Sequence, residues 1–417
     1  MKPVKRLLCH TALLGGLCAS AQGAGFAISE QSAAAMGAGG AWCAEQSPAS
    51  IFFNPAGFAG MEQSGLEVGM NMLIPSTQFT GPTNMPGYSS IDMTSQTFLV
   101  PNVYWTRPLG NGHSVGLGLF SYLGLGVEWE DDWVGRENIE NIGLTTITVN
   151  PSWAWKVNDR LRVGAGVSMT YGAMELSKDT YTGLPMNRYV DAEMDGTGTA
   201  FGVNLGGQYD VNDRLTLGLA WRSPMTLSAE GTAKFSWPAA DNPTQQALLV
   251  SQFPETDLTV DVDLPGILTA GASYKASDVL TVRGDFVFST WSAYKELGFD
   301  FKTETNLLKD QHLPKNYIDT WAIRLGGDWA MNEQMRLRAG YYFETHATET
   351  DMVEPSLPDA DRNGYSVGLG YDLDERNTLD FYFLMVSLND RVSQFPSFPG
   401  GYQSSIPILG LSWTRGL

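Results

Sequence analysis

The chain has 417 residues and a formal net charge of −19, because 45 Asp and Glu residues outnumber 26 Lys and Arg residues. This acidic balance excludes a chain-wide basic surface for nucleic acid, and a content of 17% charged and 11% aromatic residues excludes a disordered chain. Three cysteines and four histidines leave little material for a disulfide framework, a Cys-rich zinc site or histidine chemistry. A chain of this length forms either several soluble domains or one large all-β barrel.

Residues 1–23 have the organisation of a secretory signal peptide. Three basic residues precede an apolar run over 7–19 that is too short to span a bilayer comfortably. Small residues follow, so we expect cleavage after Gly23, with Ala21 as the second choice. The exported chain then keeps only Cys43 as a thiol and has no internal disulfide.

Residues 24–62 show no periodic pattern and are rich in Ala, Gly and Ser. The segment ends near the motif Asn54-Pro55-Ala56-Gly57. Pro55 removes a backbone donor and fixes φ, while the amide of Asn54 is able to bond unpaired backbone groups of a strand. These properties suit a rigid segment that does not pair as a strand, and an ordinary Asn-Pro turn is the alternative interpretation.

From about residue 64 onward, apolar residues alternate with small or polar residues. This period of two is typical of β-strands with one apolar face. The clearest examples are 66–72, 161–171, 215–222, 280–288, 321–329, 337–343 and 379–385. No run of 18 apolar residues follows the first 23 residues, which excludes transmembrane helices.

Short and long connections alternate between these strands. Short polar turns are expected at 110–112, 158–159, 212–213, 277–278, 332–333 and 374–375. Long polar stretches occupy 81–94, 127–143, 178–196, 232–256, 302–316, 346–362 and 393–404. Six turns and seven loops separate fourteen strands, with every long loop at one end. This arrangement is typical of an outer-membrane β-barrel, with a soluble barrel as the alternative.

Tryptophan residues near the predicted strand ends suit the aromatic girdles of such a barrel. They are Trp105, Trp153, Trp155, Trp221, Trp291, Trp329 and Trp413.

The third predicted strand contains a break in its alternation. Its first part alternates up to about residue 119, and Tyr122-Leu123-Gly124-Leu125-Gly126 then interrupts the period. Two glycines at such a break indicate a bulge or kink. The alternative is a strand that ends in a Gly-rich loop.

One long loop, 232–256, is apolar enough to receive a lipid. Its apolar residues include Phe235, Trp237, Leu248, Leu249 and Phe253. Exposed apolar clusters of this kind mark binding grooves or membrane contacts. The equally weighted alternative is that these side chains cap the barrel by packing on each other.

The alternation also predicts a basic inner wall. If large apolar residues face lipid, the arginines that face the lumen are Arg162, Arg222, Arg283, Arg324, Arg336 and Arg338. Such a wall suits a carboxylate ligand, or else its arginines pair with acids such as Glu30, Glu45, Asp285 and Asp328. Arg222 and Arg324 lie furthest from the short turns and are therefore our candidates for a carboxylate contact.

Several motifs resemble the FadL-type long-chain fatty acid transporters of outer membranes. Ala24-Gly25-Phe26, Ser29-Glu30-Gln31-Ser32 and Phe53-Asn54-Pro55-Ala56-Gly57 resemble the N-terminal plug of that family. Further matches follow in order, at 100–102, 264–265, 290–292 and 357–362. One departure is Leu417, which stands where the barrel-assembly machinery usually prefers an aromatic residue; Trp413 is the alternative bearer of that signal.

The resemblance implies an all-β fold: a monomeric 14-stranded antiparallel transmembrane β-barrel (63–417), plugged by an N-terminal hatch (24–62), in the Gram-negative outer membrane. It implies a hydrophobic cargo that enters an external groove, then an internal pocket, and leaves sideways where the third strand kinks beside the hatch. Residues that resemble this gate are Asn54, Pro55, Ala56, Gly57, Tyr122, Leu123 and Gly124. No cofactor and no metal are implied.

The cargo itself stays open. The basic positions of the best-known fatty acid transporter fall near Ala173 and Gly298, and neither residue is basic. Because similar channels of the family take up aromatic hydrocarbons, these are the alternative to long-chain fatty acids. The acidic loops 127–143 and 346–362 are expected to meet lipopolysaccharide through divalent cations, or else to stay solvated.

Two other classes of protein compete with this interpretation. An outer-membrane protease or lipase needs a nucleophile with a base, and we find no Ser-His-acid arrangement, hence no catalytic residue. A general porin would have no hatch, so residues 24–62 argue against it.

Overall fold

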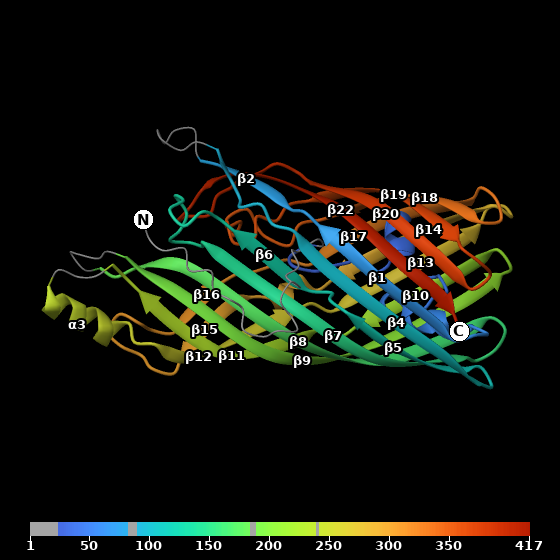
Figure 1. Ribbon diagram of the computed structural model, residues 1–417, viewed down its shortest axis with the longest axis horizontal. Helices are drawn as coiled ribbons and strands as arrows, with labels where there is room; N and C mark the ends of the chain where they lie inside the picture. Colours follow the sequence, from blue (N-terminus) through green and yellow to red (C-terminus); the bar gives the residue numbers. More distant parts are fainter. Residues whose placement is uncertain (1–23, 82–89, 184–188, 239–241) are drawn as a thin grey trace.

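The protein is described here by a computed structural model that covers residues 24–81, 90–183, 189–238 and 242–417. Figure 1 shows long tilted strands around a lumen, with the blue N-terminal segment among them. The predicted signal peptide, 1–23, lies outside the described residues. None of the helices in the described ranges has the length and apolar character that crossing a bilayer requires.

The strands form a closed antiparallel barrel of fourteen crossings, as predicted. The first seven crossings consist of β1 (Gly65–Leu73) with β2 (Ser76–Thr80), β3 (Ile91–Asp92) with β4 (Phe98–Gly110), β5 (His113–Phe120) with β6 (Gly124–Glu128), β7 (Asn141–Lys156), β8 (Leu161–Tyr181), β9 (Tyr189–Asn212), and β10 (Leu215–Arg222) with β11 (Met225–Ser236). The last seven consist of β12 (Thr256–Leu264) with β13 (Ile267–Lys275), β14 (Leu280–Ser289) with β15 (Glu296–Phe301), β16 (Gln311–Pro314) with β17 (Thr320–Ala330), β18 (Met335–Glu344), β19 (Arg362–Asp372), β20 (Asn377–Leu388), and β22 (Gly400–Gly416) preceded by β21 (Arg391–Ser393).

The barrel closes because β1 pairs with both its sequence neighbour and the last strand. β1 is antiparallel to β4 on one side and to β22 on the other, with Leu73 opposite Ile408 at one end of the pairing. A sheet without free edges satisfies every backbone group within the wall, which is the condition for crossing a lipid bilayer.

Helical structure is confined to short pieces. They are α1 (Ala33–Gly37), α2 (Ser50–Phe53), η1 (Pro55–Phe58), α3 (Pro243–Gln252) and η2 (Trp291–Ala293). The first three belong to residues 24–62, which we call the hatch from here on, and α3 stands at the end of the barrel that carries the long loops (Figure 1).

All six short turns that the sequence predicts are present at the opposite end. Four of them use the same device: a side-chain oxygen at the first turn position accepts the backbone N–H groups two and three residues later. The acceptors are Asn158, Asn212, Asn332 and Asp374. The turn at 110–112 instead relies on left-handed backbone at Gly110, Asn111 and Gly112.

The predicted alternation of faces is also present. On β8, the exposed residues Val167, Met169 and Tyr171 alternate with the buried residues Ser168 and Thr170. The exposed side chains form an apolar outer face of the kind that contacts lipid.

Two sequence-based expectations need correction. Strand pairing continues into the expected loop 178–196, since β8 runs to Tyr181 and β9 starts at Tyr189, with Thr180 opposite Val190. Trp291 is not part of a lipid-facing girdle, because it is 1% exposed and its ring packs on Phe26 of the hatch.

We expect a chain that lacks residues 24–62 to insert as a barrel. All strand pairs of the wall lie between Gly65 and Gly416, and the hatch adds only an isolated bridge. The measurement is heat-modifiable migration in a denaturing gel together with far-ultraviolet circular dichroism, with the full chain as control. A truncated chain without a heat-modifiable band would show that the wall needs the hatch in order to fold.

Candidate functional site

The hatch lies against the inner wall at positions where the wall has no side chain. A Cβ atom on Gly206 would lie 2.0 Å from Oδ1 of Asn54, and one on Gly340 would lie 2.0 Å from the backbone nitrogen of Gly39. Other wall glycines with similar approaches are Gly164, Gly218, Gly326 and Gly368. The small residues of the predicted alternation therefore mark where the hatch docks.

Asn54 anchors this contact from the hatch side. Its Nδ2 donates to the carbonyl oxygens of Cys43 (2.7 Å) and of Gly207 on β9 (3.1 Å), and its Oδ1 accepts the N–H of Ala56 (3.1 Å). A Cβ atom on Gly57 would lie 2.4 Å from a hatch carbonyl. The motif is thus a rigid bracket between the hatch and the wall rather than a free turn.

Cys43 belongs to the same bracket. Its side chain is 1% exposed, and burial, followed by the nearby carboxylate of Asp285, raises the pKa of the thiol. Asp285 accepts the backbone N–H groups of Trp42 and Cys43 at 2.8 and 2.9 Å. The thiol therefore stays protonated and serves the packing of the hatch.

The third crossing of the wall is broken between β5 and β6. β4 pairs with β5 as far as the pair of Asn102 and Phe120, and within the described residues its pairing does not continue onto β6. On the other side, β6 stays paired with β7 from Gly124 to Glu128. The break predicted at Tyr122-Leu123-Gly124 is therefore a kink in a continuing strand and not the end of one.

The hatch takes the place of β4 along this kink. Ala27 forms an antiparallel bridge with Leu123. The backbone N–H of Ile28 donates to the Tyr122 carbonyl (2.8 Å), and that of Gly124 donates to the carbonyl preceding Ala27 (2.9 Å). We call this contact of Phe26–Ile28 with the third crossing the latch.

Side chains satisfy the remaining backbone groups of the kink. Oγ1 of Thr146 donates to the carbonyl of Leu123 (2.6 Å), and Oγ of Ser121 donates to the carbonyl of Thr146. Nε2 of Gln31 in the hatch donates to the carbonyl of Ser121. Strand pairing is thus interrupted at the kink, and the hatch supplies hydrogen bonds that a neighbouring strand would otherwise provide.

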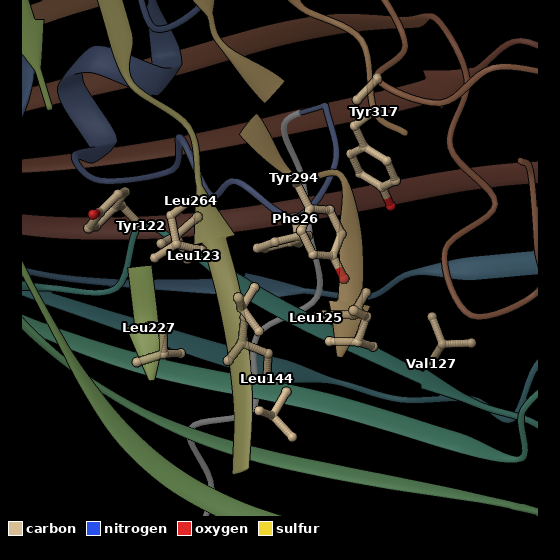
Figure 2. Packing of buried hydrophobic residues seen from close by; sticks show 14 of the residues in the cluster. Phe26, Tyr122, Leu123, Leu125, Val127, Leu144, Leu227, Leu264, Tyr294 and Tyr317 are labelled. Atoms are coloured by element: carbon tan, nitrogen blue, oxygen red, sulfur yellow. The ribbon is translucent and has the colours of Figure 1, made fainter. Parts of the chain in front are cut away.

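Aromatic residues seal the lumen beside the latch. Figure 2 shows Phe26 next to Tyr294, with Leu123, Leu125 and Leu144 nearby. The ring of Phe26 meets Trp291 and Tyr294 edge-on, with centroids 4.7 and 5.5 Å apart. These ring contacts are apolar and add no hydrogen bonds to the two backbone hydrogen bonds of the latch.

A cavity lies between the hatch and the wall, next to the kink. It contains about 810 Å³ of space that protein atoms do not fill, its open mouth included. The hatch contributes Ala27, Ile28 and Pro55 to the lining of this cavity. The third crossing contributes Tyr122.

Arg222 projects into this cavity from β10. Its guanidinium carbon lies 4.9 Å from the ring centroid of Tyr122, and 5.5 and 5.6 Å from those of Phe52 and Phe120. Its nitrogens donate to Oγ of Ser168 (2.9 Å) and to the carbonyl oxygen of Phe52 (3.2 Å). Among the described residues, no carboxylate forms an ion pair with it.

Arg324 lines the same cavity from β17. It is 8% exposed, its guanidinium carbon lies 5.6 Å from the ring centroid of Tyr342, and its Nε has no hydrogen-bond partner. In the described part of the chain, it too lacks an ion pair. Asp285 and Glu344 also line the cavity, but Asp285 already accepts two hatch N–H groups.

The other four predicted lumenal arginines have acidic partners. The pairs are Arg162 with Asp210, Arg283 with Glu45 of the hatch, Arg336 with Asp372, and Arg338 with Asp328 and Asp380. Asp210, Asp372 and Asp380 were missed by the sequence analysis, although each sits on the polar face of its strand. The structure thus separates four ion-paired arginines near the short turns from two at the cavity that have no direct ion pair among the described residues. Of these two, Arg324 still interacts electrostatically with the carboxylates of Glu30, Asp285 and Glu344.

The apolar residues of the external loop pack mostly on each other. Leu249 and Phe253 are buried, and Phe235 and Trp237 pack against them. Leu248, in contrast, is 42% exposed. In the described residues these five side chains therefore do not form one open groove; four of them hold α3 on the extended hairpins.

The expected contact between the Asn-Pro-Ala motif and the kink is also corrected. Asn54 contacts β9, and a Cβ atom on Gly164 of β8 would lie 2.3 Å from Pro55. The kink instead contacts Phe26–Ile28, and no pattern in the sequence predicted this contact. Pro55 and Tyr122 do line the same cavity.

Comparison with known proteins gives a consistent result. The family model described as outer membrane protein transport protein (OMPP1/FadL/TodX) matches residues 16–396. A putative outer membrane protein, NMB0088, of Neisseria meningitidis is 28% identical over 89% of this chain and 88% of its own. The long-chain fatty acid transport protein of Salmonella typhi is 21% identical over 90% and 91%.

Solved structures resemble the fold over nearly its full length. A FadL homologue of Pseudomonas aeruginosa superposes with a TM-score of 0.81 at 21% identity, covering 94% of this chain and all of its own. The toluene transporter TodX of Pseudomonas putida gives a TM-score of 0.74 at 16% identity, covering 95% and 99%.

We expect Gly340→Ala to displace the hatch while leaving the wall intact. The new methyl group would overlap backbone atoms of Gly39, and such overpacking costs about 1–3 kcal/mol. The measurement is single-channel conductance, which should rise from a closed to a steadily conducting state. Gly327→Ala is the matched control, because its nearest neighbour would lie 3.8 Å away. Unchanged conductance in a folded Gly340→Ala protein would contradict the docking role of the glycines.

Proposed function

Because the chain belongs to the OMPP1/FadL/TodX family of outer membrane transport proteins, we propose that its hydrophobic cargo occupies the cavity beside Arg222 and Arg324 and leaves sideways at the latch. The family transports hydrophobic compounds through the outer membrane, and its members are transport channels rather than enzymes. The wall is in contact with outer-membrane lipid, so a sideways exit delivers an apolar molecule directly into its preferred solvent.

The cargo that we propose is a long-chain fatty acid. The observation that supports this proposal is that two buried arginines, Arg222 and Arg324, line one cavity and form no direct ion pair among the described residues. A buried charge is costly unless it is paired, so the carboxylate of a ligand would supply the missing counter-charge. The apolar side chains that share the lining with them suit the alkyl chain.

Aromatic hydrocarbons are the alternative cargo, since structural neighbours include toluene transporters. They would use the apolar lining and leave both arginines unpaired. A general porin is a weaker alternative, because the hatch makes close contacts with the inner wall across β8, β9, β18 and β19.

The latch supports a sideways exit for a physical reason. It joins hatch and wall at the kink through two backbone hydrogen bonds, at 2.8 and 2.9 Å, where a regular barrel would have a full strand pair. Separating Phe26–Ile28 from the third crossing would therefore uncover an opening beside the cavity without breaking another strand pair.

The surroundings of the wall follow from the same proposal. Its outer face would contact lipid and lipopolysaccharide, and the barrel-assembly machinery would insert it as a monomer. Glu140, beside an external loop, illustrates the acidic outer rim: burial, followed by the carboxylates of Asp179 and Asp191, raises the pKa of this group to about 8. Divalent cations between such acids and lipopolysaccharide would relieve this repulsion.

We expect Arg324→Gln to weaken binding of dodecanoate about 10- to 100-fold, because a hydrogen bond to a charged group contributes about 1.5–3 kcal/mol. Equilibrium binding of radiolabelled dodecanoate to the purified barrel checks this. Toluene binding should not change, and Arg336→Gln, whose partner is Asp372 near a short turn, is the matched control. Equal dodecanoate affinity in the two variants would favour the hydrocarbon alternative.

We expect a disulfide across the latch to stop uptake without abolishing cargo binding. In the pair Ala27→Cys and Leu123→Cys, the residues face each other at an antiparallel position where the hydrogen bonds flank them. Such positions have Cα atoms about 4.5 Å apart, which suits a disulfide.

Uptake of radiolabelled dodecanoate by cells is the measurement, with the two single-cysteine variants as controls and a reducing agent to restore transport. Normal uptake by the oxidised double variant would exclude an exit at the latch.

A further inference from the structure

One residue, Arg222, contacts the hatch and the kink and also lines the cavity. Arg222 lines the cavity from β10, donates to the carbonyl oxygen of Phe52 in α2 of the hatch, and lies over the ring of Tyr122 in the kink. None of the other five lumenal arginines has a ring or hydrogen-bond contact to the third crossing among the described residues. Arg222 therefore connects α2 of the hatch with the kink, in addition to the hydrogen bonds by which the latch and Gln31 join the hatch to the third crossing.

We propose that Arg222 couples occupancy of the cavity to release of the latch, acting as a positioning residue through Tyr122. This inference rests on the proposed function, because it assumes a carboxylate cargo in the cavity. In this proposal, Arg324 binds the carboxylate. Arg222 transmits the effect of carboxylate binding to Tyr122.

Weak contacts with uncharged groups hold the Arg222 guanidinium at the cavity. Three aromatic rings surround it at 4.9–5.6 Å, and its two hydrogen-bond acceptors among the described residues are a hydroxyl and a carbonyl oxygen, both uncharged. A carboxylate forms shorter and about twice as strong hydrogen bonds with a guanidinium group. An arriving carboxylate would therefore draw the guanidinium away from the Phe52 carbonyl and from the ring of Tyr122.

The consequence at the latch follows from chain connectivity. Tyr122 is the residue whose carbonyl accepts the hydrogen bond from Ile28, and Leu123 comes directly after it. When the Tyr122 ring loses the cation that lies over it, a force that holds this stretch of backbone inward is lost. The latch hydrogen bonds then open more often, and the cargo next to them gains its exit.

The same geometry accounts for the two parts of the hatch that face the third crossing. Ile51 and Phe52 reach β5, since Cβ atoms on Gly116 and Gly118 would lie 2.7 and 2.9 Å from Ile51 and the rings of Phe52 and Phe120 are 5.2 Å apart. Phe26–Ile28 reach the kink. Arg222 lies between these two contacts, so its movement affects both.

The test uses the rate of disulfide formation in the Ala27→Cys and Leu123→Cys double variant as a reporter of latch opening. A closed latch holds the two thiols together, so saturating dodecanoate should slow the formation of the disulfide in the protein with Arg222. With Arg222→Met in addition, the slowing should disappear, although Arg324 still binds dodecanoate at a higher concentration.

The expected size of the effect lies between about threefold and about thirtyfold, since a cation–aromatic contact changes an equilibrium by the smaller factor when exposed and by the larger when shielded from water. Tyr122→Leu is a second variant, because it removes the ring but leaves both arginines. It should also lose the slowing by dodecanoate, measured at a dodecanoate concentration that saturates this variant. Tyr122→Phe, which keeps the ring, should behave like the parent.

Dodecanoate that slows the disulfide equally with Arg222→Met and Tyr122→Leu would overturn the coupling role. So would a parent protein in which saturating dodecanoate has no effect on the rate. Normal uptake by the oxidised double variant would show separately that the proposed exit is wrong. Unchanged dodecanoate affinity in Arg324→Gln would show separately that the proposed cargo is wrong. Heat-modifiable migration confirms that each variant is folded before its rate is measured.

Discussion

Backbone hydrogen bonding in a membrane is the constraint on which this structure depends. A strand in lipid must find all its partners within the protein, so the wall has to close, and β1 pairing with β22 achieves this. The kink in the third crossing is the place where regular pairing with a neighbour is given up. There the hatch, Ser121 and Thr146 provide the missing partners. At this position a separate segment of the chain, rather than a neighbouring strand, supplies part of the hydrogen bonding that a wall in lipid needs.

The inner surface of the barrel follows from the need to hold that segment. Glycines such as Gly206 and Gly340 let the hatch backbone approach the wall more closely than any Cβ would permit. Salt bridges near the short turns, including the one from Arg283 to Glu45, add fixed points at that end. The hatch is thus held firmly by shape and charge along β8, β9 and β18, and more loosely where only two backbone hydrogen bonds join it to the kink.

Charge in the lumen divides in the same way. Four lumenal arginines form ion pairs, whereas Arg222 and Arg324 face a cavity and form no direct ion pair among the described residues. Unbalanced buried charge destabilises a protein unless a ligand compensates it. The loosely held part of the hatch, the uncompensated arginines and the cavity lie together, and this coincidence gives the proposed route its physical basis.

The sequence by itself determined the barrel, since a period of two, six polar turns and seven long loops leave one architecture that suits a membrane. It also identified the break at Leu123 and set Arg222 and Arg324 apart from the other arginines, because position along a strand follows from counting residues. Only the tertiary structure decided what lies opposite the break. Asn54-Pro55-Ala56 docks on β8 and β9, and Ala27 faces Leu123, because the path of a segment without periodicity depends on where the wall has room for it. For the same reason the burial of Trp291 and the packing of Leu249 and Phe253 could not be read from their neighbours in the chain: their partners come from distant parts of the sequence that meet only once the barrel has closed.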